Sequence, residues 1–277
     1  MQAKRESASM PGSNQEHLRG KVAIVTGGGR GLGRAMALAL AAAGANVIVT
    51  AAREAAEIEA VATQASAGRI IPLLATVAQP DECDRVVALA AERFGRLDIL
   101  VNSAGRGMKY VSENFLTEPT RFWETDPAVW QMVIDTNVNG PFYMARSAVP
   151  VMLKGGWGRI INVSMNHQTM RRAGFSPYGP SKAALESETV IWAQDLNATG
   201  ITVNAILPGG ATLTGMIPDG VTDAVKAKLL PPEIVVQPLL WMSSEASNGV
   251  TGKRFDASLW RSDVCPDDAA AQSGQAL

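Results

Sequence analysis

The chain is poor in the residues that build disulfide scaffolds and metal centres. Its 277 residues include only two cysteines and two histidines. One possible cysteine pair is no disulfide framework in a chain of this length, so we expect a protein of a reducing, cytoplasmic compartment. Because His17 lies in a polar N-terminal stretch, His167 stands alone, and we expect no metal site.

An excess of charge of one sign is also missing. Lys and Arg number 25 and Asp and Glu 26, which gives a formal net charge of −1. Such a balance creates no overall field that attracts nucleic acid or an anionic membrane, and we expect neither as a partner. The apolar fraction of 47% is typical of globular proteins and allows a sizeable core.

Long uncharged hydrophobic runs are absent except for one. Ala35–Ala52 contains no charged residue and approaches the length of roughly 18 residues at which a membrane span is considered. The run is rich in alanine, however, and Gly44-Ala45-Asn46 interrupts it. This pattern favours a short helix followed by a buried strand. The N-terminus lacks the basic-then-apolar pattern of a secretory signal.

Short runs of apolar, often β-branched residues alternate with helix-forming stretches such as Asp81–Phe94. Continuous runs of this kind predict strands that are buried on both faces. We predict strands at Val22–Thr26, Asn46–Thr50, Ile70–Leu74, Leu97–Val101, Arg159–Val163 and Ile201–Leu207. The alternation predicts an α/β fold with a doubly wound parallel sheet, as a single domain over residues 20–261. Residues 1–19 and 262–277 are expected to be flexible tails.

A glycine-rich turn follows the first predicted strand and leads directly into a helix. Its sequence is Thr26-Gly27-Gly28-Gly29-Arg30-Gly31-Leu32-Gly33. Glycines allow a tight turn and a close approach of backbone N–H groups to a pyrophosphate, and the helix N-terminus adds partial positive charge. The turn therefore predicts dinucleotide binding. Its T-G-x-x-x-G-x-G spacing resembles that of the short-chain dehydrogenase/reductase family, which implies a Rossmann-type fold.

The end of the second predicted strand indicates which dinucleotide is bound. An acidic residue there usually holds the ribose 2′-hydroxyl of NAD, whereas an Arg accommodates the 2′-phosphate of NADP. Ala51 stands where an NAD-preferring relative would carry Asp. Arg30 is placed as in NADP-preferring members of the family, and Arg53 adds a second possible contact. We expect NADP(H) as the preferred cofactor, with NAD(H) as the alternative. The alternative to a contact with the cofactor is that both arginines simply face solvent.

The resemblance implies further cofactor contacts around the sheet. After the third strand the family typically has an Asp that contacts adenine, where this chain reads Ala75-Thr76-Val77. Asn102-Ser103-Ala104-Gly105 resembles the N-N-A-G element of the family, and Pro208-Gly209 matches its turn over the nicotinamide. The expected cofactor-binding residues are Gly27, Gly29, Arg30, Gly31, Leu32, Ala51, Ala52, Arg53, Thr76, Val77, Asn102, Ala104, Gly105, Tyr178, Lys182, Pro208, Gly209, Ala211 and Thr212.

A Tyr and a Lys four residues apart, Tyr178 and Lys182, share one face of a predicted helix. An ammonium favours the phenolate and lowers the tyrosine pKa from its ordinary value of about 10. Tyr178 then serves as general acid in reduction and general base in oxidation. Ser164, at a strand end, is expected to hold the substrate oxygen. By the resemblance, Lys182 also holds the nicotinamide ribose, and Asn137 relays a proton through water to it.

The loop between Gly105 and Trp130 is longer than in compact members of the family and contains four aromatic residues, Tyr110, Phe115, Phe122 and Trp123. We hypothesise that this loop forms a wall of the substrate pocket and favours an apolar or aromatic carbonyl. A surface loop or subunit contact is the alternative. Arg171-Arg172 is either a solvated turn or a site for an acidic partner such as an acyl carrier protein.

The sequence thus favours an NADP(H)-dependent oxidoreductase that reduces a ketone or aldehyde, or oxidises a secondary alcohol. One alternative is a 3-oxoacyl-thioester reductase of fatty-acid synthesis. Another is a catalytically inactive, dinucleotide-binding regulatory protein, against which the set Asn137, Ser164, Tyr178 and Lys182 argues. By the resemblance we expect a homo-oligomer, a tetramer or a dimer, although the C-terminal stretch Thr251–Trp260 departs from the family pattern.

Overall fold

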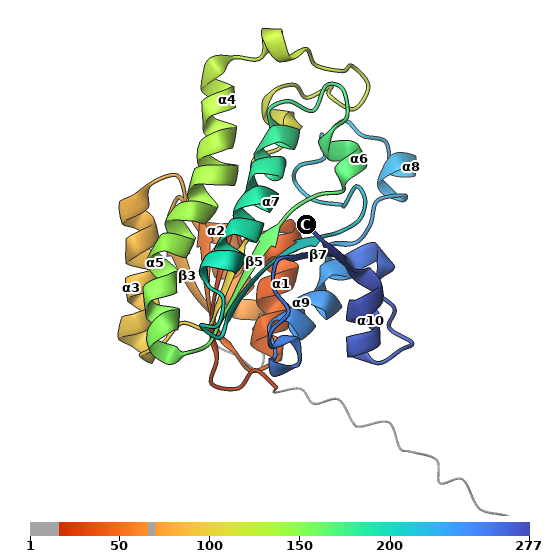
Figure 1. Ribbon diagram of the computed structural model, residues 1–277. Helices are drawn as coiled ribbons and strands as arrows, with labels where there is room; N and C mark the ends of the chain where they lie inside the picture. The colour runs from red at the N-terminus through yellow and green to blue at the C-terminus, as the bar shows by residue number, and fades with distance from the viewer. Residues whose placement is uncertain (1–16, 66–69) are drawn as a thin grey trace, which may run out of the picture.

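A sheet of eight strands forms the centre of the computed structural model, which describes residues 17–65 and 70–277 (Figure 1). The strand order is β3-β2-β1-β4-β5-β6-β7-β8, and every neighbouring pair is parallel except β7 with β8. The strands are β1 Val22–Thr26, β2 Asn46–Ala51, β3 Ile70–Leu74, β4 Ile99–Asn102, β5 Gly158–Val163, β6 Ile201–Leu207, β7 Lys253–Asp256 and β8 Gly274–Ala276.

Helices cover both faces of this sheet. Buried side chains of α1, α2, α9 and α10 pack on one face, and those of α3, α5 and α7 on the other. The helices are α1 Gly31–Ala42, α2 Ala55–Gln64, α3 Pro80–Phe94, α4 Pro127–Ile134, α5 Gly140–Gly155, α6 His167–Met170, α7 Tyr178–Asp195, α8 Asp223–Lys226, α9 Val236–Met242 and α10 Pro266–Ser273. The fold is the expected single α/β domain with a doubly wound sheet of the Rossmann type.

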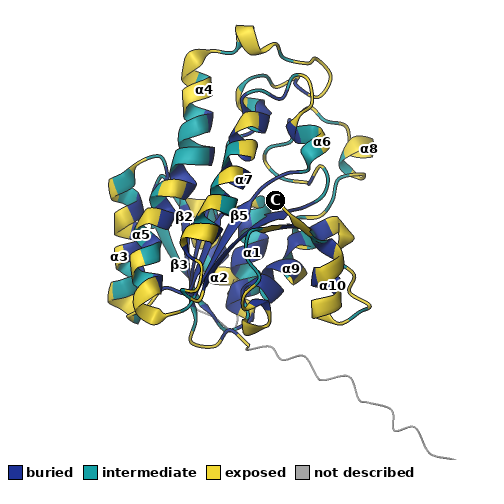
Figure 2. Ribbon diagram, viewed as in Figure 1, coloured by how far each residue is buried: buried dark blue, intermediate teal, exposed yellow. Residues whose placement is uncertain are grey.

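Each central strand is buried along its whole length, as its β-branched composition predicts (Figure 2). The predicted bounds of β1, β3 and β6 are those of the structure, and β4 begins two residues later than predicted. Leu97 and Asp98 precede β4 instead; Asp98 Oδ2 accepts a hydrogen bond from the Val22 N–H at 2.8 Å. The run Ala35–Ala52 forms α1 and β2, and no helix in the described ranges has both the length and the apolar character to cross a membrane.

The C-terminal residues are not the flexible tail that we expected over residues 262–277. They form α10 and the edge strand β8, which pairs antiparallel with β7. Ala269 and Ala270 are buried against the core, and Trp241 Nε1 donates to Asp267 Oδ1 at 2.7 Å. Small side chains allow this close packing, and the free edge of β7 supplies backbone partners that composition does not reveal. Of the expected N-terminal tail, residues 1–16 lie outside the described ranges, and Leu18 belongs to the core.

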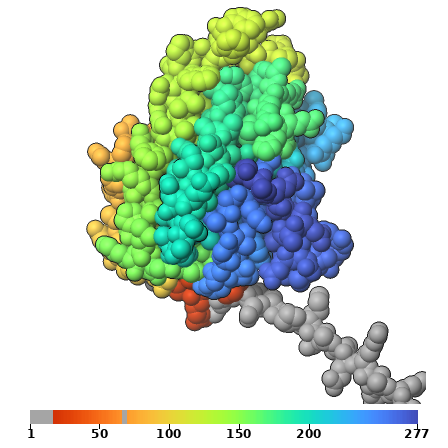
Figure 3. Space-filling model, in the orientation of Figure 1, coloured from red at the N-terminus to blue at the C-terminus, as the bar shows by residue number. Residues whose placement is uncertain are grey.

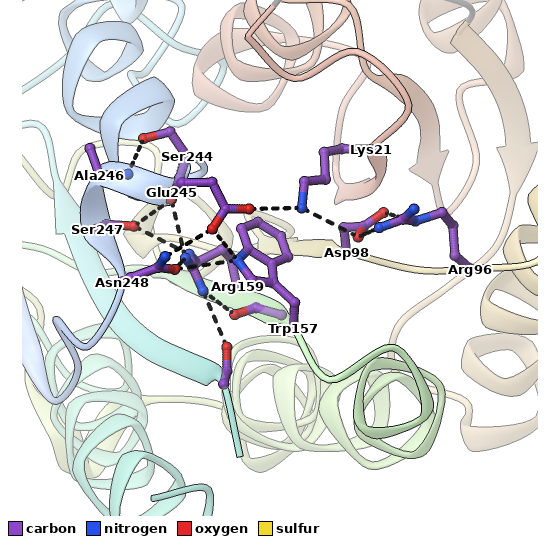
Figure 4. A network of polar contacts seen from close by, with 12 residues as sticks. Lys21, Arg96, Asp98, Trp157, Arg159, Ser244, Glu245, Ala246, Ser247 and Asn248 are labelled. Atoms are coloured by element: carbon purple, nitrogen blue, oxygen red, sulfur yellow. Dashed lines mark hydrogen bonds and ion pairs between the residues drawn. The ribbon is translucent and has the colours of Figure 1, made fainter. Parts of the chain in front are cut away.

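A polar network joins the amino ends of the strands, away from the end that carries the glycine-rich turn (Figure 4). At its centre the Arg159 guanidinium is buried 4.0 Å from the centre of the Trp157 ring. It donates to the carbonyl oxygens of Gly158 at 2.9 Å and Ser244 at 3.1 Å. Burial lowers the pKa of Arg159 to about 10. These hydrogen bonds offset part of the cost of burying the Arg159 charge at the amino end of the sheet.

A crevice lies at the opposite end of the sheet, where the carboxyl ends of the strands are. Strand order reverses between β1 and β4, since the chain goes from β1 outward to β3 and returns to the other side of β1. In open α/β sheets, ligands bind outside the carboxyl ends of the strands at such a switch point. The segment between β4 and α4 rises above this end, at the top of the space-filling view (Figure 3).

Candidate functional site

A cavity of about 500 Å³ lies at the carboxyl ends of the strands. It extends from the glycine-rich turn after β1 to the start of α7. Most of the predicted site residues line it. These are Gly27, Gly29, Arg30, Gly31, Leu32, Ala51, Ala52, Arg53, Ala104, Gly105, Ser164, Tyr178, Lys182, Pro208, Gly209, Ala211 and Thr212. The fold therefore gathers segments that are far apart in the sequence around one space.

Four predicted residues do not line the cavity. Thr76 donates its N–H to Glu82 Oε2 at 2.8 Å, and Val77 is buried in the core. The Asn102 amide donates to Asn162 Oδ1 at 2.8 Å, inside the sheet. Asn137 is buried behind the cavity wall, where its amide donates to Ser181 Oγ at 2.9 Å. The contacts of Asn102 and Asn137 support the walls of the cavity and leave their side chains out of it.

The glycine-rich turn leaves no room for side chains. Gly27 has a φ of +64°, and a Cβ added there would lie 2.8 Å from Ala104 Cα. A Cβ on Gly33 would lie 2.1 Å from the carbonyl oxygen of Gly27. The backbone thus folds tightly at the start of the twelve-residue helix α1, whose N-terminus faces the cavity. An exposed backbone at a helix N-terminus fits a dinucleotide pyrophosphate.

Thr26, the last residue of β1, ties the glycine-rich turn to the turn after β4. Its Oγ1 accepts hydrogen bonds from the N–H groups of Ser103 and Ala104, both at 3.0 Å. These two hydrogen bonds hold the glycine-rich turn and the turn after β4 together, in the arrangement in which Gly27 packs on Ala104. The Thr26 hydroxyl thereby fixes the floor of the cavity. Thr26 is part of the glycine-rich pattern in the sequence. The N–H groups that its hydroxyl binds, however, follow a different strand, β4.

Arginines and carboxylates meet at the end of the cavity beside β2. Ala51, Ala52, Arg53 and Glu54 line this end, so β2 ends without a carboxylate but Glu54 follows shortly after it. Arg30 Nη1 instead lies 3.4 Å from Glu57 Oε1, in the first turn of α2. Sequence reasoning missed Glu57, although its place four residues after Arg53 puts it near the strand end. The pair is partly exposed, and such surface ion pairs contribute little to stability.

Tyr178 and Lys182 lie in the first turns of α7, and both face the cavity. Lys182 Nζ donates to the Val163 carbonyl oxygen at 2.7 Å and lies 5.9 Å from the centre of the Tyr178 ring. Burial lowers the pKa of Lys182 to about 8, an effect that the Glu186 carboxylate opposes. Burial raises the pKa of Tyr178 to about 12. Burial thus shifts the Tyr178 pKa in the direction opposite to the expected lowering, while the Lys182 ammonium donates to the end of β5.

A buried carboxylate that sequence reasoning missed holds the serine at the end of β5. Ser164 Oγ donates to Glu186 Oε1 at 2.7 Å, and His167 Nε2 lies 2.7 Å from Glu186 Oε2. Arg254 Nε is 3.4 Å from Glu186 Oε1, and its Nη2 donates to the Met165 carbonyl oxygen at 2.8 Å. We call Ser164, His167, Glu186 and Arg254 the Glu186 cluster. The helical spacing of Glu186 from Lys182, four residues, was the available signal.

The long loop after β4 supplies part of the far wall of the cavity. Tyr110 and Phe115 line it, and the Phe115 ring meets the Phe175 ring edge-on at a centroid distance of 6.0 Å. Phe122 and Trp123 do not line it; their side chains are 69% and 63% exposed, and their rings meet edge-on at a centroid distance of 5.1 Å. Two of the four aromatic residues thus fit the hypothesis of a pocket wall, and two form an exposed surface.

Comparison with known proteins agrees with this geometry. The family model for short chain dehydrogenases matches residues 21–223. A 3-oxoacyl-(acyl-carrier-protein) reductase of Synechocystis sp. is 37% identical over 69% of this chain and 74% of its own. A D-beta-hydroxybutyrate dehydrogenase of Rhizobium meliloti is 31% identical over 92% of this chain and 95% of its own. The crystal structure of a dehydrogenase/reductase from Sinorhizobium meliloti 1021 matches with a TM-score of 0.75 and 32% identity, covering 87% of this chain and 94% of that one.

Proposed function

The chain belongs to the short-chain dehydrogenase family, and we propose from this premise that Ser164, Tyr178 and Lys182 are its catalytic residues. As a member it is an oxidoreductase that interconverts C=O and CH–OH groups with a nicotinamide dinucleotide. The proposal depends mainly on one observation: the three side chains line the cavity that the glycine-rich turn opens into. Asn137, buried behind Ser181, is proposed to position α7.

A nicotinamide cofactor, when bound, would supply or accept the hydride. The chain's own side chains act on the substrate oxygen and its proton. Ser164 turns its hydroxyl from Glu186 to the substrate oxygen and stabilises the charge that develops there. Tyr178 donates its proton to that oxygen during reduction. Because its pKa is raised to about 12, the phenol is protonated at neutral pH and suits this acid role. In oxidation Tyr178 takes the proton as its phenolate, which the Lys182 ammonium would favour after turning from the Val163 carbonyl oxygen toward the phenol.

The cofactor preference is proposed to be for NADP(H), with NAD(H) as a weaker alternative. β2 ends in Ala51, which carries no charge, and Arg30 and Arg53 line the same end of the cavity, together with the carboxylates Glu54 and Glu57. Glu57 lies 3.4 Å from Arg30, so a 2′-phosphate must compete with this carboxylate for the guanidinium. Glu57 therefore moderates a preference that Arg30 creates.

Opposite effects are expected from two substitutions at this pair. Arg30→Ala should raise the KM for NADPH about tenfold, since a charged hydrogen bond contributes roughly 1.5–3 kcal/mol, and should leave the KM for NADH nearly unchanged. Glu57→Gln should lower the KM for NADPH. Arg34→Ala is the control, because Arg34 lies in the first turns of α1, the helix that Arg30 precedes, and its guanidinium contacts Gln64. Steady-state kinetics with a panel of ketones and both cofactors measures these values and tests the proposed function. Equal KM shifts for both cofactors would refute the assignment of Arg30.

Glu186→Gln is expected to lower kcat/KM about tenfold, because a neutral amide accepts the Ser164 hydrogen bond more weakly and leaves the hydroxyl less firmly placed. It also removes the carboxylate that opposes the lowering of the Lys182 pKa to about 8. That pKa should fall further, so Lys182 loses its proton, and the enzyme its activity, at lower pH than in the wild type. The measurement is the pH profile of kcat and kcat/KM.

Glu188→Gln is the matched control for the pH profile. Glu188 lies two residues further along α7, and burial raises its pKa to about 7, but it has no contact with Ser164. The Glu186 substitution leaves Arg254 without its carboxylate, which costs on the order of 3 kcal/mol of unfolding free energy, so thermal unfolding is recorded beside the kinetics. An unchanged pH profile in a folded Glu186→Gln enzyme would contradict the role given to Glu186.

A second candidate is a 3-oxoacyl-thioester reductase, which the reductases of Synechocystis sp. and Thermotoga maritima favour by their identity of 37% and 31% to this chain. Assay of an acetoacetyl thioester beside simple ketones separates the two. The inactive regulatory protein is not favoured, because it has no use for Ser164, Tyr178 and Lys182 around one cavity.

A cytoplasmic homo-oligomer, dimer or tetramer, completes the proposal. Apolar side chains on the outer helices support self-association: Phe142 and Leu153 on α5 are 45% and 46% exposed, and Ile191 on α7 is 52% exposed. Contacts between copies of the chain would cover these residues.

A further inference from the structure

Three basic side chains line the cavity besides Arg30, Arg53 and Lys182: they are Arg106, Lys109 and Arg172. The acidic residues that line the cavity are Glu54 and Glu57, which follow β2. The lining therefore has an excess of positive charge in a wall that also contains the aromatic rings of Tyr110 and Phe115.

One of the three cations is neutralised by carboxylates of the chain. Lys109 Nζ lies 3.0 Å from Asp219 Oδ2 and 4.0 Å from Glu113 Oε1. These contacts span the cavity mouth, from the loop after β4 to the segment before α8. Because Lys109 already has two counter-ions, it is a poor candidate for binding an anionic ligand.

The two arginines have no carboxylate within 4.0 Å among residues 17–65 and 70–277. Arg106 Nε donates to Thr136 Oγ1 at 3.3 Å, and its guanidinium carbon lies 4.7 Å from the centre of the Tyr110 ring. The guanidinium carbon of Arg172 lies 5.3 Å from the centre of the Phe175 ring. Aromatic rings hold both planar groups, and donors of both stay without an anionic acceptor.

We propose that the substrate carries a carboxylate that Arg106 and Arg172 bind, so that the enzyme acts on oxo acids and the corresponding hydroxy acids. The proposal rests on the proposed function, since it assigns the part of the substrate remote from the reacting carbonyl. A guanidinium offers parallel N–H donors that match the two oxygens of a carboxylate. The apolar and aromatic wall formed by Phe115 and its neighbours then faces the carbon chain. The hypothesis of an apolar or aromatic carbonyl substrate then narrows to an oxo acid with an apolar chain.

The position of Arg106 favours a small acid over an acidic protein. Its backbone N–H donates to the buried Asn137 side chain at 2.8 Å, and its guanidinium stacks on Tyr110 inside the cavity wall. Only a ligand that enters the cavity reaches it. A protein surface that docks at the mouth would meet Arg171 and Arg172, both of which are exposed.

The test compares each oxo acid with its neutral methyl ester. The probes are 3-oxobutanoate, 4-oxopentanoate and 5-oxohexanoate, because the distance from carbonyl to carboxylate differs along this series. We expect kcat/KM for at least one acid to exceed that of its ester by about tenfold, the contribution of charged hydrogen bonds. Arg172→Met and Arg106→Met should each lower this ratio about tenfold and leave the ester unchanged, and Arg172→Lys should restore part of it.

Arg171→Met is the matched control, since Arg171 is the exposed neighbour of Arg172 and does not line the cavity. Binding of pentanoate to the NADPH-loaded protein, measured by calorimetry beside pentan-1-ol, gives a readout that needs no turnover. The Arg106 and Arg172 variants should lose pentanoate binding, and Arg171→Met should retain it.

Four results would overturn the proposal. Equal rates for acids and esters would refute it and leave the proposed function intact. A higher KM for NADPH in Arg106→Met would assign that arginine to the cofactor. Reduction of a carrier-protein thioester alone, impaired equally by Arg171→Met and Arg172→Met, would assign the arginines to an acidic protein. If no ketone, ester or acid is reduced with either cofactor, the proposed function falls, and this proposal with it.

Discussion

Tyr178→Phe is expected to lower kcat about a thousandfold or more, in line with the contribution of roughly 10²–10⁴ that a positioned general acid makes. The substitution removes only the phenol oxygen and keeps the aromatic ring of the first residue of α7. The hydroxyl is the proton donor that we propose for the substrate oxygen, and burial keeps it protonated at neutral pH by raising its pKa to about 12. The measurement is the rate of NADPH oxidation at saturating ketone.

The loss should appear in turnover and not in cofactor affinity. The glycine-rich turn lies at the other end of the cavity from α7, so NADPH titration by fluorescence should give a nearly unchanged Kd. Tyr143→Phe serves as the control: it removes the same oxygen from a tyrosine of α5 that does not line the cavity. Wild-type turnover in Tyr178→Phe would eliminate Tyr178 as the general acid.

Gly33→Ala is expected to weaken NADPH binding more than about a hundredfold, which corresponds to roughly 2.7 kcal/mol. The added Cβ would lie 2.1 Å from the Gly27 carbonyl oxygen. No side-chain rotation relieves this contact, because the backbone fixes the position of a Cβ and the oxygen is itself a backbone atom. Either the turn or the first turn of α1 must move. The backbone N–H groups then lose the arrangement that fits a pyrophosphate.

Gly155→Ala is the control for this prediction, since a Cβ at Gly155 meets nothing within 4 Å. Circular dichroism and thermal unfolding without cofactor establish that the Gly33 variant is folded, and the stabilisation on adding NADPH then measures the loss of binding. An unaltered NADPH affinity in the folded variant would show that the turn does not hold the pyrophosphate.

The central strands could be predicted because their local composition and their burial agree. β1 and β6 consist mostly of apolar and β-branched residues that are buried on both faces of a parallel sheet. The last two strands of the sheet, β7 and β8, escaped prediction. Lys253–Asp256 is short and carries charged residues, and Gly274–Ala276 pairs only because β7 presents a free edge.

The candidate site also has features that the local sequence predicts and features that it does not. The glycine pattern and the Tyr178–Lys182 spacing are local, because a tight turn and one face of a helix are set by residues close in the sequence. Those patterns by themselves pointed to a dinucleotide fold and to its candidate catalytic residues. They did not indicate where the proton equilibria lie, since burial, not helical spacing, raises the pKa of Tyr178 and lowers that of Lys182.

Contacts between distant segments decided the rest. Glu186 meets Arg254 from β7, and Arg30 meets Glu57 from α2. Arg106 and Arg172 face one cavity from loops that follow different strands. A charged residue in a sequence does not reveal whether a counter-ion lies beside it, because that depends on which segments the fold brings within about 4 Å, the range of an ion pair. The sequence by itself determined the fold and the reaction class; only the tertiary structure decided which charges are paired and which remain to bind a substrate.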